Sequence, residues 1–214
     1  MRLLRDHPDS ELSTACRGGA VCVEIGSGSG LVGLAAASLG GHVLLTDVPT
    51  VVENGITPNL EANANIEAEL SPVAWEGACT IGQGSAAATE YDWRSLPKHK
   101  ETYLDADADW PVLNPLSREA DVVIAAECLW LKSLLEPFVE ASYALLSNPK
   151  TVMFMSTRER AKEGSEMFVS PVMAIEALRE RGCHVEVILE EEGVDINCGN
   201  SPVRVFRIQQ KPCQ

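Results

Sequence analysis

The sequence lacks any hydrophobic run long enough to cross a membrane. A transmembrane helix needs about 18 consecutive apolar residues, and no such run occurs among the 214 residues. The opening stretch, MRLLRDHPDS, also lacks the apolar segment of a secretory signal peptide. We therefore expect a chain that does not associate with membranes, and its length suits a single domain with a sizeable core.

Paired cysteines and metal-ligand spacings are missing as well. The seven cysteines are scattered, odd in number and form no CxxC pair, and the four histidines show no metal spacing. This pattern argues against a disulfide framework and against a zinc site. We expect reduced thiols and a cytoplasmic or nuclear protein that holds no metal.

Positive charge is scarce. The chain has 17 Lys and Arg against 31 Asp and Glu, a formal net charge of −14 and a pI near 4.7. A nucleic-acid backbone would be repelled by this charge, so nucleic acid is not expected as a partner. A lysine-rich protein surface is compatible with it, although the same charge could serve solubility alone.

Apolar segments of two periodicities alternate along the chain. Short buried runs predict strands, and longer amphipathic or wholly apolar runs predict helices. This alternation is typical of βαβ units, and the last two strands have no helix between them. We therefore predict an α/β, Rossmann-like doubly wound sheet of seven strands, six parallel and the last antiparallel. The strands are expected at 20–25, 42–47, 71–80, 120–127, 151–157, 184–189 and 203–208, and the helices at 31–39, 48–70, 131–148 and 170–182. Within 48–70, Gly55 and Pro58 predict a break or restart, with Thr57 as the N-cap of the second helix.

Glycines and serines alternate directly after the first strand. The run reads Glu24-Ile25-Gly26-Ser27-Gly28-Ser29-Gly30, and a helix follows it. A backbone bare of side chains can approach a ligand closely. Such loops bind either dinucleotides or S-adenosylmethionine. The dinucleotide motif, counted from Gly26, requires a small residue at position 31, where this chain has Leu31. The pattern acid-x-Gly-x-Gly-x-Gly of the methyl donor fits in full, so this cofactor is predicted.

Two acids complete the predicted cofactor site. Asp47 ends the second strand, 19 residues after Gly28, where an acid can accept hydrogen bonds from both ribose hydroxyls. Glu24 would suit the amino group of the methionine moiety, directly or through water. The other reading is that the glycines form a tight turn and that Asp47 caps a helix.

With these residues, the YDW motif at 91–93 and AAECLW at 125–130, the chain resembles the seven-β-strand methyltransferases. More narrowly it is similar to the methyltransferase-like protein 21 group, whose characterised members methylate lysines of other proteins. The resemblance implies an acceptor site at Glu127 and Trp130, with Trp93 beside the adenine and Ala126 lining the cofactor site. Trp75 and Trp110 are rivals for the place of Trp93, which could instead be a core residue.

The segment before the first strand departs from this group. Members usually carry a longer segment with a Trp-Asp pair, whereas residues 1–19 hold no tryptophan. We expect either a truncated chain or a site that closes differently, followed by one methyltransferase domain over 20–214.

The expected function is methylation of a protein side chain, most readily a lysine ε-amine. The expected partner is a lysine-bearing protein, a basic one or a chaperone-like complex, and the chain itself is expected to be a monomer. A small-molecule methyltransferase and a non-catalytic cofactor-binding protein on the same fold remain alternatives.

Overall fold

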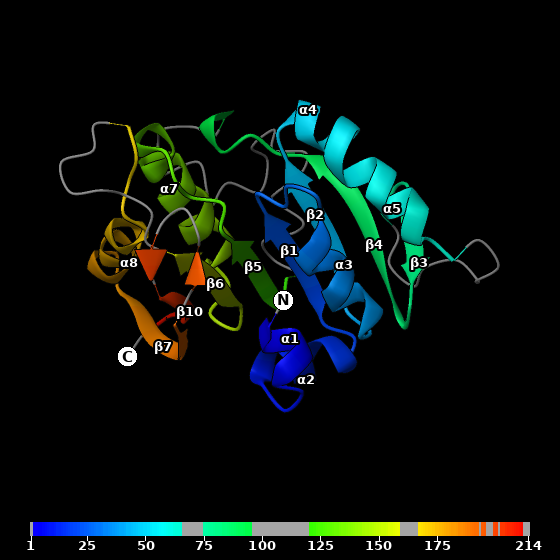
Figure 1. Ribbon diagram of the computed structural model, residues 1–214, viewed down its shortest axis with the longest axis horizontal. Helices are drawn as coiled ribbons and strands as arrows, with labels where there is room; N and C mark the ends of the chain where they lie inside the picture. The colour runs from blue at the N-terminus through cyan, green and yellow to red at the C-terminus, as the bar shows by residue number, and fades with distance from the viewer. Residues whose placement is uncertain are drawn as a thin grey trace. The chain divides into compact units, whose positions relative to one another are not determined.

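The computed structural model places the described residues in two units (Figure 1). It describes residues 2–65, 75–95, 120–158, 167–192, 194–195, 199–200 and 202–211. The first unit comprises 1–92 and 119–126, and the second comprises 93–118 and 127–214, so the chain changes units between Ala126 and Glu127. Within the described ranges, no helix has both the length and the apolar character needed to span a membrane.

The first unit is built on five strands in the order β3-β4-β2-β1-β5. The central strand β1 is parallel to β2 and β5, β2 is parallel to β4, and β3 is antiparallel to β4. The inner strands are almost wholly buried, as expected for parallel strands covered on both faces. The bounds are β1 Val21–Ile25, β2 His42–Asp47, β3 Cys79–Ile81, β4 Gly84–Glu90 and β5 Val122–Ala126.

Helices cover this sheet and one of its ends. Helix α3 packs on β2 and β4, and α5 packs on β4 and β3. The two N-terminal helices lie near the amino end of β1 (Figure 1), and the second of them is capped by the Ser10 hydroxyl, which accepts from the Ser13 N–H at 3.2 Å. The bounds are α1 Arg2–Asp6, α2 Glu11–Arg17, α3 Leu31–Ser38, α4 Pro49–Val51, η1 Val52–Ile56 and α5 Thr57–Asn63.

The third strand of the parallel set differs from the prediction. It was expected within 71–80, but β4 at Gly84–Glu90 is the strand that pairs with β2. In the described part of the expected range, 75–80, only Cys79 and Thr80 belong to a strand, which is β3. Four small residues, Ser85 to Ala88, give β4 no hydrophobic alternation. The start of the strand is crowded, because a Cβ at Gly84 would lie 2.1 Å from the Gly41 carbonyl oxygen.

The predicted break between two helices at Gly55 and Pro58 is also wrong. Thr57 was expected to be an N-cap, but its φ and ψ of −57° and −47° are helical. The chain instead passes from α4 through the π-helical turn η1 into α5, one continuous helix in Figure 1. A π turn shifts the hydrogen-bond ladder, so a proline can follow it without ending the helix.

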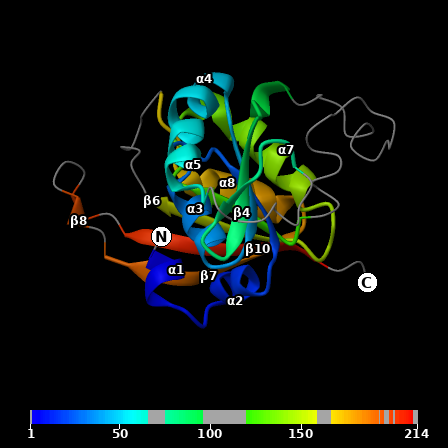
Figure 2. The same cartoon turned by 90° about the vertical axis from the view of Figure 1, so that its right-hand side faces the viewer.

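The second unit contains three long strands in the order β6-β10-β7. Strand β10 is antiparallel to both neighbours, which confirms the prediction for the last strand. With the five strands of the first unit, the long and paired strands number eight among the described residues, not seven, because β3 and β4 are separate. The short strands β8 and β9 form a hairpin beyond β7 and β10 (Figure 2). The bounds are β6 Val152–Arg158, β7 Cys183–Glu191, β8 Val194–Asp195, β9 Gly199–Asn200 and β10 Val203–Gln210.

Two helices of the second unit are braced against each other. The Arg181 guanidinium bridges Glu136 and Glu140 of α7, and its Cζ lies 5.7 Å from the centroid of the Tyr143 ring. These contacts hold the C-terminal end of α8 on α7. The bounds are η2 Trp93–Ser95, η4 Lys132–Leu134, α7 Leu135–Leu145 and α8 Pro171–Glu180.

Candidate functional site

The glycine loop of the first unit is held by backbone geometry that glycine adopts readily. Gly26, Gly28 and Gly30 have φ values of 66°, 58° and 75°. The hydroxyl of Ser27 donates to the Glu24 carbonyl at 3.2 Å and accepts from the Thr46 N–H at 3.0 Å. Ser27 therefore links the ends of β1 and β2, and its side chain has a structural function beside its predicted place in the cofactor site.

Asp47 is bonded to the glycine loop. Its Oδ2 accepts from the Gly28 N–H at 2.8 Å, and its Oδ1 accepts from the Val48 N–H at 2.8 Å. A carboxylate has about four acceptor positions, so each oxygen keeps capacity for a further donor. The structure therefore brings Asp47 and Gly28 together as predicted, while ribose binding by Asp47 stays a prediction.

Glu24 lies beneath the loop. Its side chain is 1% exposed, and its Oε2 accepts from the Gly33 N–H of α3 at 3.1 Å. Burial raises the pKa of the Glu24 carboxyl to about 7, while hydrogen bonds from Ser27 and Gly33 act in the opposite direction. In this arrangement Glu24 caps the start of α3, and the predicted contact with an amino group would have to share the same carboxyl.

The loop glycines differ in the space beside them. A Cβ at Gly28 would meet nothing within 4 Å, whereas a Cβ at Gly33 would lie 2.2 Å from Leu45 Cδ2 and 2.6 Å from Glu24 Oε2. Gly33 is thus needed for close packing of α3, a role that the sequence reasoning missed. Gly28 is the position where a ligand has room to approach the loop.

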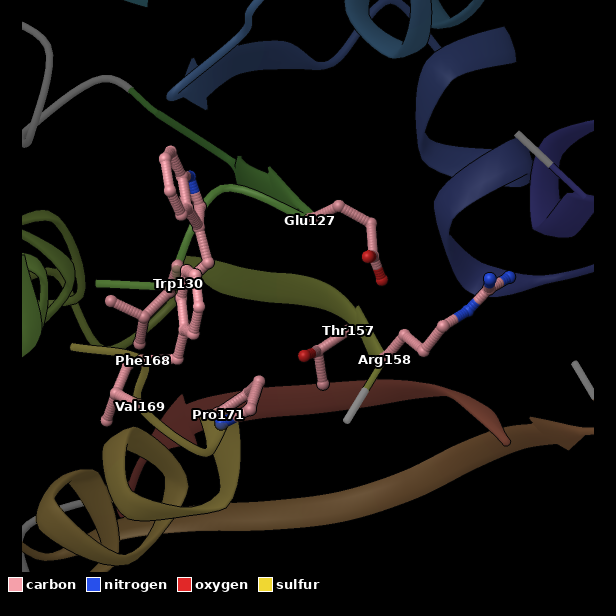
Figure 3. Close-up of a pocket in the computed structure, with 8 residues that line it drawn as sticks. Glu127, Trp130, Thr157, Arg158, Phe168, Val169 and Pro171 are labelled. Carbon is pink, nitrogen blue, oxygen red and sulfur yellow. The ribbon is translucent and has the colours of Figure 1, made fainter. Parts of the chain in front are cut away.

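The second unit holds an open pocket where β6 ends (Figure 3). In this view the Glu127 carboxylate and the Thr157 hydroxyl lie between an aromatic pair, Trp130 and Phe168, and the Arg158 side chain. The eight lining residues are Glu127, Leu129, Trp130, Thr157, Arg158, Phe168, Val169 and Pro171.

The backbone of Glu127 is strained. Among the residues that the structure describes, Glu127 alone combines a side chain with a positive φ, which is 55°. Its N–H donates to the Ser156 carbonyl of β6 at 2.9 Å, and its Oε1 is shielded from solvent. A non-glycine residue in the left-handed region costs about 1–3 kcal/mol and occurs preferentially at functional sites. This conformation supports the predicted importance of Glu127 and was not visible in the sequence.

Trp130 is held by a short backbone pairing. The Val169 N–H donates to the Trp130 carbonyl at 3.0 Å, and the Lys132 N–H donates to the Met167 carbonyl at 2.9 Å. The rings of Trp130 and Phe168 have centroids 6.2 Å apart. Trp130 is 47% exposed, so its ring forms a wall of the pocket rather than part of the core.

The other predicted aromatic has a different environment. Trp93 is buried and makes an edge-to-face contact with Phe138 of α7, with ring centroids 5.3 Å apart. It is not among the eight lining residues of the pocket. Its contacts fit the alternative of a core residue, and an adenine contact stays a prediction. Trp75 lies in the first unit, and Trp110 lies outside the described residues.

The structure therefore groups the predicted residues into two sets. Glu24, the three loop glycines, Ser27 and Asp47 meet in the first unit, where Ala126 ends β5. Glu127 and Trp130 meet in the second, together with Thr157, Phe168 and Pro171, which the sequence reasoning missed. The only sequence signal for these three was their position, with Thr157 at the end of a predicted strand, and Phe168 and Pro171 just before and at the start of a predicted helix.

Sequence comparisons match this chain to a family model and to curated proteins. The family model for lysine methyltransferases matches residues 3–83. The chain is 23% identical over 175 residues to EEF1A lysine methyltransferase 3 of Mus musculus, covering 82% of this chain and 58% of that protein. The protein of the same name from Xenopus tropicalis is 23% identical over 151 residues, covering 71% and 52%. The chain thus spans little more than half the length of these relatives.

Solved structures agree on the fold. A SAM-dependent methyltransferase from Methanosarcina mazei gives a TM-score of 0.58 at 12% identity, covering 90% of this chain and 93% of that one. Magnesium protoporphyrin IX methyltransferase from Synechocystis PCC 6803, solved with bound SAH, gives 0.52 at 12% identity, covering 96% and 83%. The chain has the α/β fold of the S-adenosylmethionine-dependent methyltransferases, and its resemblance to the protein-lysine methyltransferases among them is confirmed.

Proposed function

We propose that the chain transfers a methyl group from S-adenosylmethionine to the ε-amine of a lysine in another protein. One observation carries the proposal: the carboxylate of Glu127, presented by a strained backbone, lies in a pocket walled by Trp130 and Phe168. A carboxylate beside aromatic rings suits a long cationic side chain. The family match over 3–83 and the names of the two relatives support the same acceptor.

The glycine loop fits the methyl donor better than a dinucleotide. The Gly33 N–H at the start of α3 is already bonded to the Glu24 carboxyl. A diphosphate would bring a second acidic group to this helix end, where dinucleotides normally bind. A methionine moiety carries no phosphate, and the open space beside Gly28 and the free acceptor capacity of Asp47 offer room and hydrogen bonds for it.

When bound, the sulfonium cofactor supplies an activated methyl group. The task left to the protein is to hold an amine in line with that group and to let it lose a proton. A lysine has a reference pKa of about 10.4, so reaching the neutral amine near pH 7.4 costs about 4 kcal/mol.

Glu127 and Trp130 have separate parts in this task. The Glu127 carboxylate accepts hydrogen bonds from the ammonium, orients it and favours its charged form, so the residue acts in capture. The lysine ammonium then gives its proton to water or to the Glu127 carboxylate as the methyl group approaches. Trp130 contacts the cation with its ring face, worth about 0.5–1 kcal/mol at an exposed site.

Cofactor choice is tested by thermal stability with three ligands. S-adenosylmethionine or S-adenosylhomocysteine at about 100 times its dissociation constant should add about 2.7 kcal/mol and raise the melting temperature by about 5–11 °C. NAD should give no shift. A shift with NAD alone would overturn the cofactor assignment.

The acceptor is tested with tritiated methyl donor. Purified EEF1A, the acceptor in the names of the two relatives, and a cell extract serve as acceptors. Label in acid-precipitated protein, recovered as methyllysine after hydrolysis, is the expected result. Label only in the soluble fraction would favour a small-molecule methyltransferase, and cofactor binding without any transfer would favour a non-catalytic protein.

A further inference from the structure

Large apolar side chains are exposed around the mouth of the pocket. The described part of the chain has seven exposed large hydrophobic residues. One of them is Trp130, and four more lie in the segment 167–173. We call these five the apolar rim, and each is between 36% and 62% exposed. They are Trp130, Met167, Phe168, Val172 and Met173.

The rim is held by regular backbone contacts. Residues 130–132 and 167–169 are joined by two hydrogen bonds and by an antiparallel bridge between Leu131 and Phe168. Between the exposed side chains, Val169 and Pro171 point inward and are buried. The first turn of α8 continues the rim, and the other end of that helix is anchored through Arg181. The exposure is therefore a property of a structured surface.

The apolar character ends one turn away from the pocket. The next exposed positions of α8 are Glu176, Arg179 and Glu180, as on an ordinary solvated helix. No charged residue occurs from 167 to 175 in a chain whose net charge is −14. Contiguous exposed apolar surface of this kind marks a site of interaction, and Trp, Phe and Met are enriched at the centres of interfaces.

The rim is continuous with the acceptor pocket. Trp130 and Phe168 line the pocket and also belong to the rim. A peptide whose lysine approached Glu127 along these two rings would lie with its backbone over the rim. The residues on either side of the acceptor lysine are then the groups that contact Met167, Val172 and Met173.

We propose that the apolar rim docks large apolar side chains that flank the acceptor lysine, so that the substrate is a lysine set among hydrophobic residues rather than in a basic cluster. This inference rests on the proposed lysine methyltransferase function. A basic cluster would find no carboxylate between 167 and 175, whereas leucine or phenylalanine neighbours would remove apolar surface of both partners from water.

The test uses the double variant Met167→Ser/Met173→Ser, with Val187→Ser as its matched control. Val187 is 45% exposed but lies on β7, outside the rim. Initial rates of tritium transfer from S-adenosylmethionine into cell-extract protein are measured below saturation, with cofactor affinity and melting temperature on the same samples. We expect the double variant to lose about tenfold in rate, which is about 1.4 kcal/mol, while its cofactor affinity and melting temperature are unchanged. The rate of the control should stay within about twofold of the parent rate.

A second arm uses two blocked peptides as competitors of the same reaction. Both have one central lysine, flanked on each side by leucine and phenylalanine in one peptide and by serines in the other. The apolar peptide should inhibit labelling of extract protein at a concentration about tenfold lower, and this ratio should fall towards one in the double variant. Equal inhibition by both peptides, or parental rates in the double variant, would overturn the docking proposal alone. Absence of labelled protein with the parent chain would instead overturn the proposed function beneath it.

Discussion

The glycine loop of the first unit and the pocket of the second are stabilised in opposite ways. In the loop, positive φ angles fall on glycines, and the polar side chains of Glu24, Ser27 and Asp47 are bonded to backbone groups. In the pocket, the positive φ falls on Glu127, and large apolar rings are open to solvent. The loop has no backbone strain, whereas the pocket has a strained backbone at Glu127 and exposed apolar rings.

This difference suggests a division of labour between the two regions. A loop without backbone strain, held by hydrogen bonds, can bind a cofactor of constant structure, and changes in it should affect stability and cofactor affinity. Backbone strain at a residue that carries a carboxylate is typical of functional sites, so changes at Glu127 and the exposed rings should affect turnover and acceptor choice. Six substitutions, in four predictions, test this division in order of expected effect.

Glu127→Gln should produce the largest effect. The substitution keeps the size of the side chain and removes the charge that orients the ammonium. Methyl transfer to protein should fall about 100-fold, or about 2.7 kcal/mol, while cofactor affinity changes by no more than a few-fold. Calorimetry and tritium transfer on the same samples measure both. If the variant instead loses cofactor affinity and keeps its rate at saturating cofactor, Glu127 contacts the cofactor and not the acceptor.

Glu24→Gln should change how stability depends on pH. The folded-state pKa of Glu24 is raised to about 7 from the ordinary value of 4.5, so the folded chain binds more protons than the unfolded chain between these values. The free energy of unfolding of the parent protein must therefore fall as pH rises from 4.5 through 7, and glutamine at position 24 removes this loss. Denaturant unfolding should show the variant gaining about 2 kcal/mol on the parent between pH 5 and pH 8. A constant difference would mean that Glu24 is not a buried titrating group.

Two glycine substitutions should separate packing from ligand binding within the loop. Gly33→Ala places a methyl group against Leu45 and Glu24, and it should lower the free energy of unfolding by about 1.5 kcal/mol. Gly28→Asp faces open space, so apart from the strain of a side chain at a φ of 58°, about 1 kcal/mol of stability, its effect should be about tenfold weaker cofactor binding by calorimetry, or about 1.4 kcal/mol. Undiminished affinity in Gly28→Asp would show that the cofactor binds elsewhere.

Glu127→Gly and Glu127→Ala should reveal the strain itself. Both remove the carboxylate, but only glycine relaxes at a φ of 55°. The glycine variant should be more stable than the alanine variant by about 1 kcal/mol in denaturant unfolding, the reverse of the usual order. An alanine variant of equal or greater stability would mean that the backbone of residue 127 is not strained.

The two regions also differed in how far they could be predicted from sequence. The loop is local: strand, glycines and Asp47 lie within 27 residues, and spacing alone indicated their arrangement. The pocket joins Glu127 to Phe168 and Pro171, about 40 residues further on, and no periodicity indicates that pairing. The positive φ of Glu127 is imposed by its surroundings, and a glutamate shows no preference for it. Strand β4 was missed for a third reason, because its small residues fit a crowded space and carry no strand pattern.

The π-helical turn η1 accommodates one residue more than a regular helical turn. Each residue of an α-helix advances the chain by about 100° around the axis, so an extra residue in a regular helix would rotate every later side chain by that angle. The wider turn absorbs the extra residue locally. Asn59 therefore keeps the direction in which its side-chain amide donates to the Ser29 carbonyl of the glycine loop at 2.9 Å. Deleting one residue between Val52 and Ile56 should restore regular α pairing and leave this contact in place, whereas an insertion between Ile56 and Asn59 should turn Asn59 away from the loop.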